Sequence, residues 1–440
     1  MSLFRIHIVA LIIVILTGAG FAQTKPISLN ECLSIALQNN PDIRLAAEEQ
    51  NKSIADYQLV KATDRLQVGA VVNTAKEPNA AGKAVNLFDL FAGFTASYPL
   101  AHPGQGSREE IARKNLDISK ITEKKTNDEI VLAVKTAYYG CISARKSTEV
   151  RDRIKKNFAV RLNATKGLVQ TGDRPILDQS MAEVSLSQSN LEYQKAKNQE
   201  EVAKSELRVA MGVLSSDTPI LTEDFPEMYQ LKYGIDEIQN FINQYCYDVL
   251  TARVQTEIAK EGISVARAQH LPFADITGIW GKTYVGVDPK NIEYKGFSDR
   301  KRWETSMGVV FSAHISIFTG GAIAAQTDGA IADYNKALYN ERKVLLKARK
   351  DAQNFVNRLN ELRDQIEISR LNIENSRINL NLAQRSYDSG IGSQLVIQNA
   401  EGSLLEAEIG LIVAKQDYFT TMAQLSNLIG LEEKDLCGKK

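Results

Sequence analysis

An internal repeat constrains the fold of this chain more than any other feature of its sequence. One set of residues recurs at a constant spacing of 218 positions: Gly172, Leu177, Ala182, Glu183, Ser185 and Gly212 match Gly390, Leu395, Ala400, Glu401, Ser403 and Gly430. A weaker match, at a spacing of 206, pairs Leu29, Glu31, Asp42 and Ala46 with Ile235, Glu237, Asp248 and Ala252. Self-similarity at a fixed spacing indicates a duplicated unit. The chain is therefore predicted to fold as two copies of one arrangement.

The N-terminal residues are predicted to form a secretory signal. Arg5 precedes an apolar run at 6–16, and small residues follow up to Ala22, where cleavage is expected. A segment between the repeats carries Pro219 and Pro226 and indicates a linker. The predicted organisation is a signal peptide at 1–22, a first repeat at 23–212, a linker at 213–234, a second repeat at 235–431 and a C-terminal tail at 432–440.

Each repeat contains two segments in which apolar and polar residues alternate. The clearest runs over 306–318, where Met307, Val309, Phe311, Ala313, Ile315 and Ile317 share one face. Similar alternation occurs at 66–73, 90–100 and 274–281, with polar loops expected at 75–87 and 287–303. A period of two with one apolar face predicts half-buried strands. A soluble β-sandwich would show the same alternation. Four strands, however, are too few for a sandwich of useful size.

No apolar run after the signal reaches about 18 residues, so any membrane span would have to consist of strands. Backbone groups in a bilayer find no water, and an open four-stranded sheet there would need partners for its edges. Three copies of the chain would supply twelve strands, an even number within the range of outer-membrane barrels. The strand pattern thus predicts an oligomer in contact with outer-membrane lipid, and a homotrimer would supply enough strands for a barrel.

Two very long helices are predicted, at about 107–167 and 321–387. The second carries apolar residues every seven positions, namely Ile331, Leu338, Leu345, Ala352, Leu359, Ile366, Ile373, Leu380 and Tyr387. This spacing is typical of coiled-coil packing. Ser28 with Glu31, and Ser107 with Glu110, have the spacing of helix capping boxes. Gly172 and Gly390 are expected to end the long helices, so that each returns as an antiparallel partner helix.

Composition argues against several classes of function. Lys plus Arg and Asp plus Glu both number 53, so no basic field favours nucleic acid. Beyond the signal the only histidines are His102, His270 and His314, too few for a typical metal or His-based catalytic site. No enzyme activity and no cofactor are therefore expected. The spacing of Cys32, Cys141, Cys246 and Cys437 favours buried free thiols over a disulfide framework.

With these features in place, the mature sequence resembles the outer-membrane efflux protein family, often called TolC-like. The resemblance rests on Leu29, Cys32, Leu33, Ala36, Leu37, Asn40 and Pro41; on Leu271 and Pro272; on Ile317, Phe318, Gly320 and Gly321; and on the paired Gly172 and Gly390. It implies an α+β membrane protein. Long antiparallel coiled-coil helices would form a periplasmic α-barrel, and four strands per protomer would join a trimeric 12-stranded β-barrel in the outer membrane of a Gram-negative bacterium.

The resemblance also implies a function and partners. The chain would be the outer-membrane channel-tunnel of a tripartite efflux pump or type I secretion system, exporting small molecules or proteins passively. Its partners would be a periplasmic adaptor (membrane fusion) protein and an inner-membrane pump of RND or ABC type. The alternative is a soluble periplasmic coiled-coil adaptor or scaffold, although such a protein should contain one helical hairpin and not two.

Functional positions follow from the family pattern as expectations. The adaptor would dock at two tip turns, formed by Thr171, Gly172, Asp173, Arg174 and Pro175 and by Ser389, Gly390, Ile391, Gly392 and Ser393. Asp178 matches an acidic position near the first turn. The corresponding positions of the second repeat, where some members carry pore-lining carboxylates, are Val396 and Asn399. These three residues are the candidate pore constriction.

Overall fold

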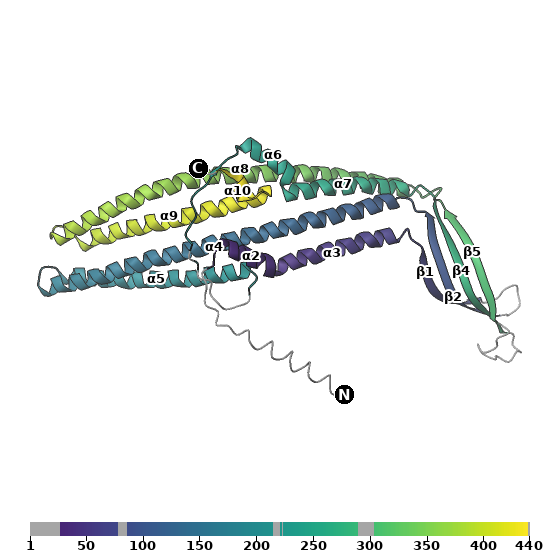
Figure 1. Cartoon of the computed structure of the whole chain (residues 1–440), viewed down its shortest axis with the longest axis horizontal. Helices are drawn as coiled ribbons and strands as arrows, with labels where there is room; N and C mark the ends of the chain where they lie inside the picture. Colours follow the sequence, from purple (N-terminus) through teal and green to yellow (C-terminus); the bar gives the residue numbers. More distant parts are fainter. Residues whose placement is uncertain (1–26, 78–85, 214–220, 222, 289–302, 439–440) are drawn as a thin grey trace, which may run out of the picture. The chain divides into compact units, whose positions relative to one another are not determined.

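The computed structural model describes residues 27–77, 86–213, 221, 223–288 and 303–438 (Figure 1). The predicted signal peptide at 1–22 lies outside the described residues, as do residues 214–220 and 222 of the predicted linker and the centres of both predicted strand-joining loops. The domain boundaries stay a prediction.

The same order of elements occurs twice along the chain (Figure 1). The first series is α2 (Leu29–Asn39), α3 (Pro41–Ala62), β1 (Gln67–Glu77), β2 (Asn86–Ala101), α4 (Gln105–Gln170) and α5 (Ile176–Ala210). The second series is α6 (Ile235–Tyr245), α7 (Tyr247–Ala268), β4 (Phe273–Asp288), β5 (Trp303–His314), α8 (Ala322–Asp388) and α9 (Gln394–Ile429). At 67 residues, α8 is about 100 Å long.

Glu31 and Glu237, which the weaker repeat matches, both cap the start of a helix, α2 and α6 respectively. The Glu31 carboxylate accepts from the Ser28 backbone N–H at 2.9 Å, and the Ser28 hydroxyl accepts from the Glu31 N–H, which confirms the predicted capping box. The Glu237 carboxylate likewise accepts from the Gly234 N–H at 3.0 Å. Each carboxylate satisfies a backbone donor that the helix start leaves open.

The predicted cap at Ser107 is wrong, because α4 begins two residues earlier at Gln105. Gly104 adopts a left-handed φ of 78° and its carbonyl accepts from the Arg108 N–H, which starts the helix before Ser107 is reached.

The opening helical segment of each repeat is broken in two. Asn40 separates α2 from α3 with φ −65° and ψ 124°, and Cys246 separates α6 from α7 with φ −62° and ψ 116°. Pro41 explains the first break, because a residue before proline is disfavoured from helical geometry. A glycine at the end of a returning helix packs against each break, Gly212 against the first and Gly430 against the second. A Cβ on Gly212 would lie 2.7 Å from the Asn40 Cα, and one on Gly430 2.8 Å from the Tyr245 carbonyl oxygen.

The four long strands form one antiparallel sheet in the order β1-β2-β4-β5. Direct partners across it include Ala70, Phe94, Trp280 and Met307, and one step further Val68, Ala96, Gly278 and Val309. Residues that lie opposite each other share a face of a sheet. The four apolar faces predicted separately therefore combine into one apolar surface. Among the described strands, β1 and β5 pair on one side only.

The strand predicted over 306–318 ends earlier than expected. β5 ends at His314 and not at Phe318, because its partner β4 begins at Phe273, which pairs with His314. Pro272 precedes this pair and has no N–H to extend the ladder. Ile317 and Phe318 are consequently unpaired, with exposed fractions of 93% and 89%.

The described chain divides into two compact units. One takes in Lys124–Tyr247 and Lys347–Lys440 with the N-terminal segment up to Leu45, and the other comprises Ala46–Glu123 and Asp248–Leu346. The sheet belongs to the second unit.

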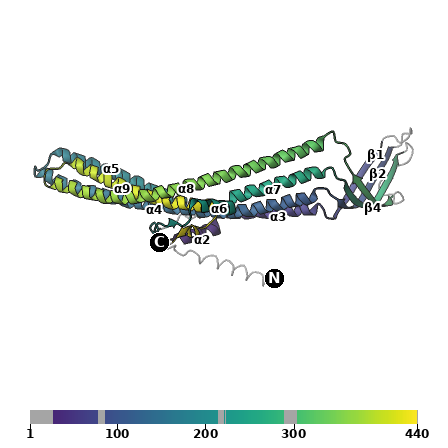
Figure 2. The same cartoon turned by 90° about the horizontal axis from the view of Figure 1, so that it is seen from above.

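In the first unit, the paired helices pack as antiparallel hairpins, α4 with α5 and α8 with α9 (Figures 1 and 2). Along α8, four apolar residues spaced seven apart are buried: Ala352, Leu359, Ile366 and Ile373. Their burial confirms this stretch of the predicted heptad. Val150, Ile154 and Phe158 of α4 form a second buried cluster, against which Leu186 of α5 and Leu405 of α9 pack.

Short elements complete the first unit. The two-residue strands β3 (Gln230–Leu231) and β6 (Cys437–Gly438) pair, and α10 (Glu433–Leu436) precedes β6. Cys32, Cys141 and Cys246 are buried, and Cys32 and Cys141 are free thiols, as predicted. The side chain of Cys437 lies outside the described residues. Within the described part of the chain, no helix is both long and apolar enough for a transmembrane segment.

Candidate functional site

The candidate site is the end of the first unit at which both helical hairpins turn. Residues 171–175 connect α4 to α5, and residues 389–393 connect α8 to α9. All ten residues predicted for the tip therefore lie in these two turns. Side-chain contacts of Arg174 join the first turn to the second hairpin.

The two turns cap their helices with the same hydrogen bonds. In the first, the Asp173 N–H donates to the Leu168 carbonyl at 2.9 Å and the Gly172 N–H to the Val169 carbonyl at 3.2 Å. In the second, Ile391 donates to Ser386 at 3.1 Å and Gly390 to Tyr387 at 3.0 Å. These are Schellman motifs, in which the first residue past the helix is left-handed. Gly172 and Gly390 both have φ 83°, which confirms their predicted role as helix ends.

The turns differ where the repeat places Arg174 against Gly392. A Cβ on Gly392 would lie 2.8 Å from the Tyr387 nitrogen and 3.0 Å from the Ser386 carbonyl carbon, so the second turn has no room for a side chain there. The first turn accommodates a full arginine at the same position. The duplicated turns have therefore become chemically distinct while keeping one backbone design.

Arg174 connects the two turns. Its guanidinium lies over the Tyr387 ring, 4.1 Å from the ring centroid, and donates to the Tyr387 carbonyl. A second donation, from Nη1, reaches the Gly392 carbonyl at 3.3 Å. Arginine suits this role because its planar, always charged fork can stack and hydrogen-bond at once. One side chain of the first hairpin thus holds three features of the second.

Asp178 completes the cluster from the first turn of α5. Its carboxylate lies 4.0 Å from Arg174 and accepts a long hydrogen bond of 3.5 Å from the Tyr387 hydroxyl. The side chains of Arg174 and Asp178 are each 14% exposed. This partial burial strengthens their attraction relative to a fully solvated pair.

Val396 and Asn399 lie on α9 and are exposed. Asp178, in contrast, is partly buried among Arg174 and Tyr387. Their shared role as a pore constriction stays a prediction.

Sequence reasoning assigned Tyr387 to the coiled-coil seam and missed its contact with Arg174. Alignment of the two repeats could have pointed to this contact. At the 218-residue spacing, Arg174 is equivalent to Gly392 and Asp178 is equivalent to Val396, so the two turns differ at both positions. Where the two turns differ in sequence, one turn can make a contact that the other cannot.

Glu401 is a second residue that sequence reasoning left without a role. It is 3% exposed and accepts from Arg161 of α4 at 2.8 Å, which joins α9 to the other hairpin. Burial raises the pKa of the Glu401 carboxyl, and the Arg161 charge partly opposes that shift. Among the described residues, no group of three or more His, Cys, Asp or Glu side chains is placed to hold a metal ion.

The sequence matches a protein-family model over most of the chain. The model of the family described as "Outer membrane efflux protein" matches residues 32–213 and 246–431. The two matched stretches contain most of the first and second series of elements.

Individual proteins and structures are similar at low identity but over nearly full length. The chain is 22% identical to the outer membrane protein TolC of Vibrio cholerae, over 93% of this chain and 92% of that protein. It is 20% identical to the cation efflux system protein CusC of Escherichia coli O157:H7, over 84% and 79%. The crystal structure of the outer membrane protein VceC from Vibrio cholerae superposes with a TM-score of 0.76 at 16% identity, covering 91% of this chain and 96% of that one.

Proposed function

This chain belongs to the outer membrane efflux protein family, and from that premise we propose that three copies assemble into a passive exit channel with a periplasmic helical tip. The predicted family, fold class, export function and outer-membrane location are confirmed by the family match and by relatives that align over most of both chains. The alternative of a soluble adaptor finds no support among these matches.

The apolar face of the sheet carries the assembly proposal. Trp280, Met307 and Phe311 are 58%, 79% and 64% exposed on one surface of the protomer. An exposed apolar patch of this kind marks an interaction with lipid or protein. The opposite face carries Ser97, Asp275 and Ser312, which suits a water-filled lumen.

The edges of the sheet support a closed oligomer. β1 and β5 are the outer strands of the four-stranded sheet, and their free edges need partners within a bilayer. Antiparallel pairing of β5 with β1 of the next copy would satisfy both. Three protomers would then close a barrel of about 12 strands, within the usual size range of such barrels.

We take the channel to be passive and without enzyme activity or a resident cofactor. Support comes from the family, whose members are named for efflux across the outer membrane. The driving force would come from partners, a periplasmic adaptor and an inner-membrane pump of RND or ABC type. The relative named as a cation efflux system protein supports a role within a larger export system, while the cargo of this chain is not assigned.

The two tip turns are the proposed adaptor site. Arg174 links the hairpins through contacts with Tyr387 and Gly392, and an adaptor that engages the turns could break these contacts. In this proposal the contacts hold the resting tip closed. Asp178, Val396 and Asn399 would line the constriction that the turns control.

Membrane fractionation tests the assembly proposal. Outer membranes from cells expressing the full chain should contain an oligomer that resists SDS without heating and dissociates to the protomer when boiled. Cross-linking should give a ladder that stops at three. A protein released by osmotic shock as a soluble monomer would contradict the proposal. For the partners, affinity capture from cross-linked cells should recover an adaptor and a pump with the wild-type chain.

A further inference from the structure

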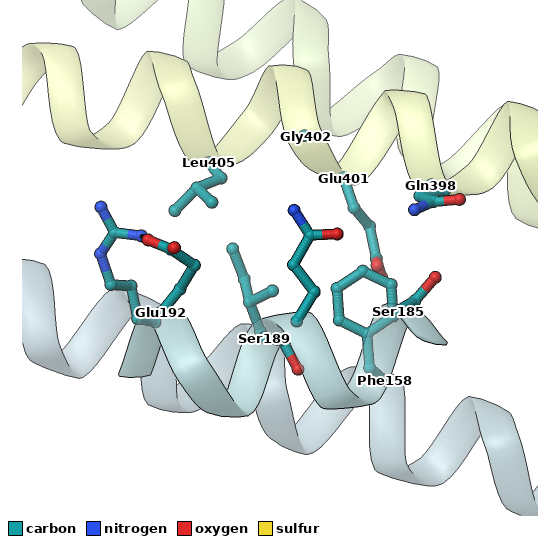
Figure 3. A pocket seen from close by; sticks show the side chains of 11 residues that line it. Phe158, Ser185, Ser189, Glu192, Gln398, Glu401, Gly402 and Leu405 are labelled. Atoms are coloured by element: carbon teal, nitrogen blue, oxygen red, sulfur yellow. Dashed lines mark hydrogen bonds and ion pairs between the residues drawn. The ribbon is translucent and has the colours of Figure 1, made fainter. Parts of the chain in front are cut away.

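A cavity of about 170 Å³ lies between the two helical hairpins of the first unit (Figure 3). Its apolar walls are Ile154 and Phe158 of α4 and Leu405 of α9, and Ser185 and Ser189 of α5 form its floor. Gly402 of α9 adds no side chain, and a Cβ there would meet nothing within 4 Å. The volume is close to that of cavities of about 150 Å³ that hold a single benzene ring.

Glu401 is a buried polar residue of this cavity, which Arg151, Gln188, Glu192 and Gln398 also line. In Figure 3 its side chain extends from α9 toward Phe158 and Ser185 on the opposite wall. Oε1 accepts from Arg161 at 2.8 Å, but Oε2 has no hydrogen-bond partner among the described residues. An acceptor that is buried without a partner is costly, so a donor that fills the cavity would be favoured.

The repeat shows that the buried state of Glu401 is specific to the second hairpin. Glu183 occupies the same repeat position on α5, but its side chain is 48% exposed. It accepts from Gln179 at 3.1 Å and lies 3.4 Å from Lys166. The same residue type is therefore solvated in one copy and left with an open acceptor in the other.

The charges around the cavity select a neutral ligand. Arg161 pairs with Glu401 at 2.8 Å, and Arg151 pairs with Glu192 at 3.2 Å beside the cavity. Each carboxylate already has an arginine partner, and Glu192 also lies 2.8 Å from Lys195, so an added ammonium would leave an excess of positive charge at the cavity. A carboxylate would meet the open oxygen of Glu401 and be repelled. A neutral ring with one hydroxyl donor avoids both penalties.

We propose that this cavity binds a small neutral phenol, with its ring between Ile154, Phe158 and Leu405 and its hydroxyl donating to Oε2 of Glu401. The site goes beyond passive export, because the ligand would be held in the channel wall. It would contact α4 and α5 of one hairpin and α9 of the other, and so would strengthen the packing of the two hairpins. A ligand that binds only the folded state stabilises it, and the stabilisation grows with the logarithm of the ligand concentration once that exceeds Kd.

Ligand-observed NMR on the full chain purified in detergent tests the proposal directly. Phenol should bind, and it should bind at least about tenfold more tightly than anisole, which has the same ring but no donor. Benzylamine, which adds a charge, should bind more weakly than phenol. Equal binding of phenol and anisole, tighter binding of benzylamine, or no binding of phenol would each overturn the proposal.

Two variants and a matched control locate the site. Glu401→Gln keeps an oxygen for Arg161 and replaces the open acceptor with an amide NH₂, so the preference for phenol over anisole should fall several-fold. Glu183→Gln, at the same repeat position outside the cavity, should leave the preference unchanged. If both variants behave alike, the assignment to Glu401 is wrong.

Ser189→Leu is a second variant that tests the site even if Glu401→Gln does not fold. The Ser189 hydroxyl donates only within its own helix, to the Leu186 carbonyl at 2.8 Å, so leucine would fill the cavity without stranding a partner. Phenol binding should be lost while the melting temperature stays level or rises. Undiminished binding in a folded Ser189→Leu protein would overturn the proposal. Phenol binding is measured on purified protein and does not require transport. A negative result would therefore overturn the binding site without contradicting the proposed channel function.

Discussion

Arg174 lies over the ring of Tyr387, with 4.1 Å between the guanidinium carbon and the ring centroid, and the two residues come from different repeats. The same guanidinium donates to the carbonyls of Tyr387 and Gly392. The contact is asymmetric, because the equivalent of Arg174 in the second turn is Gly392, which lacks a side chain. Each protomer therefore has one such link between its hairpins.

Replacing Arg174 should loosen the tip. Arg174→Lys keeps the charge but removes the planar fork, and the loss of stacking and paired donation should weaken the link by about 1–2 kcal/mol. Single-channel recording in planar bilayers should show a higher resting conductance. Arg385→Lys, an exposed position in the last turn of α8, is the control and should behave as wild type. Unchanged conductance in Arg174→Lys would show that this link does not hold the tip closed.

Gly281 should be intolerant of any side chain. It pairs with Gly93 across β2 and β4, and a Cβ on Gly281 would lie 2.6 Å from both the Ala92 carbonyl oxygen and the Gly93 Cα. Gly281→Ala must therefore displace one strand, and the yield of SDS-resistant oligomer in the outer membrane should fall severalfold. Gly308→Ala on β5 is the matched control, since a Cβ there meets nothing within 4 Å. Equal yields from the two variants would argue against tight β2–β4 pairing.

Glu408 should stabilise the packing of three helices. Its carboxylate, 8% exposed, pairs with Arg153 of α4 and with Arg377 of α8 at 3.2 Å. Both arginines are at least half exposed, so removing the carboxylate with Glu408→Ala should cost about 2 kcal/mol, less than for a fully buried pair. Thermal melting followed by circular dichroism should show a lower midpoint. Glu406→Ala, exposed on the same helix, should shift the midpoint little, and identical shifts would refute the role given to Glu408.

Cys32 and Cys141 should resist alkylation until the protein unfolds. Burial raises the pKa of each thiol to about 12 from an ordinary value of 9.0. The raised pKa favours the neutral thiol in the folded state, so this contribution to stability is complete below pH 9 and is lost as the pH rises toward 12. At pH 8 the thiolate fraction should be roughly a thousandfold below that of an unfolded chain.

Mass spectrometry of peptides containing Cys32 and Cys141 after iodoacetamide treatment measures this protection. Both residues should be labelled slowly in native protein and rapidly in denaturant. Ser403→Cys, at an exposed position of α9, supplies a thiol that should react at similar rates in both states. Rapid native labelling of Cys32 or Cys141 would mean that the surrounding helices open readily.

Much of the fold could be predicted because its patterns are local and repeated. The alternation around Met307 and Val309 identified a strand, and the seven-residue spacing through Ala352 and Leu359 identified a helical seam. Both patterns follow directly from backbone geometry. The two glycines at the helix ends were predictable for the same reason, since a left-handed turn is easiest for glycine.

Boundaries were harder to predict because they depend on partners. The apolar alternation continues to Ile317, yet β5 stops at His314, where Pro272 prevents the neighbouring strand from extending. The start of α4 was set by Gly104 two residues ahead of the predicted cap. In both cases a neighbouring backbone decided the outcome, and no pattern within the segment records it.

The candidate site illustrates the same limit. The ten turn residues were identified in sequence, but the contact between Arg174 and Tyr387 depends on how two hairpins pack, more than 200 residues apart. Glu401 is a similar case: its sequence equivalent Glu183 is exposed, and only the packing of α9 against α4 buries it. Identical positions in a repeat can therefore have opposite environments.

The outer strands β1 and β5 also bear on how the protein matures. In the proposed trimer the free edge of each of these strands pairs with a strand of the next copy, so completion of the sheet requires an encounter between molecules. The rate of such a step depends on how many newly exported chains are present at once. Maturation should therefore slow more than proportionally when synthesis is reduced, and unassembled chains should be the population most exposed to proteases and aggregation.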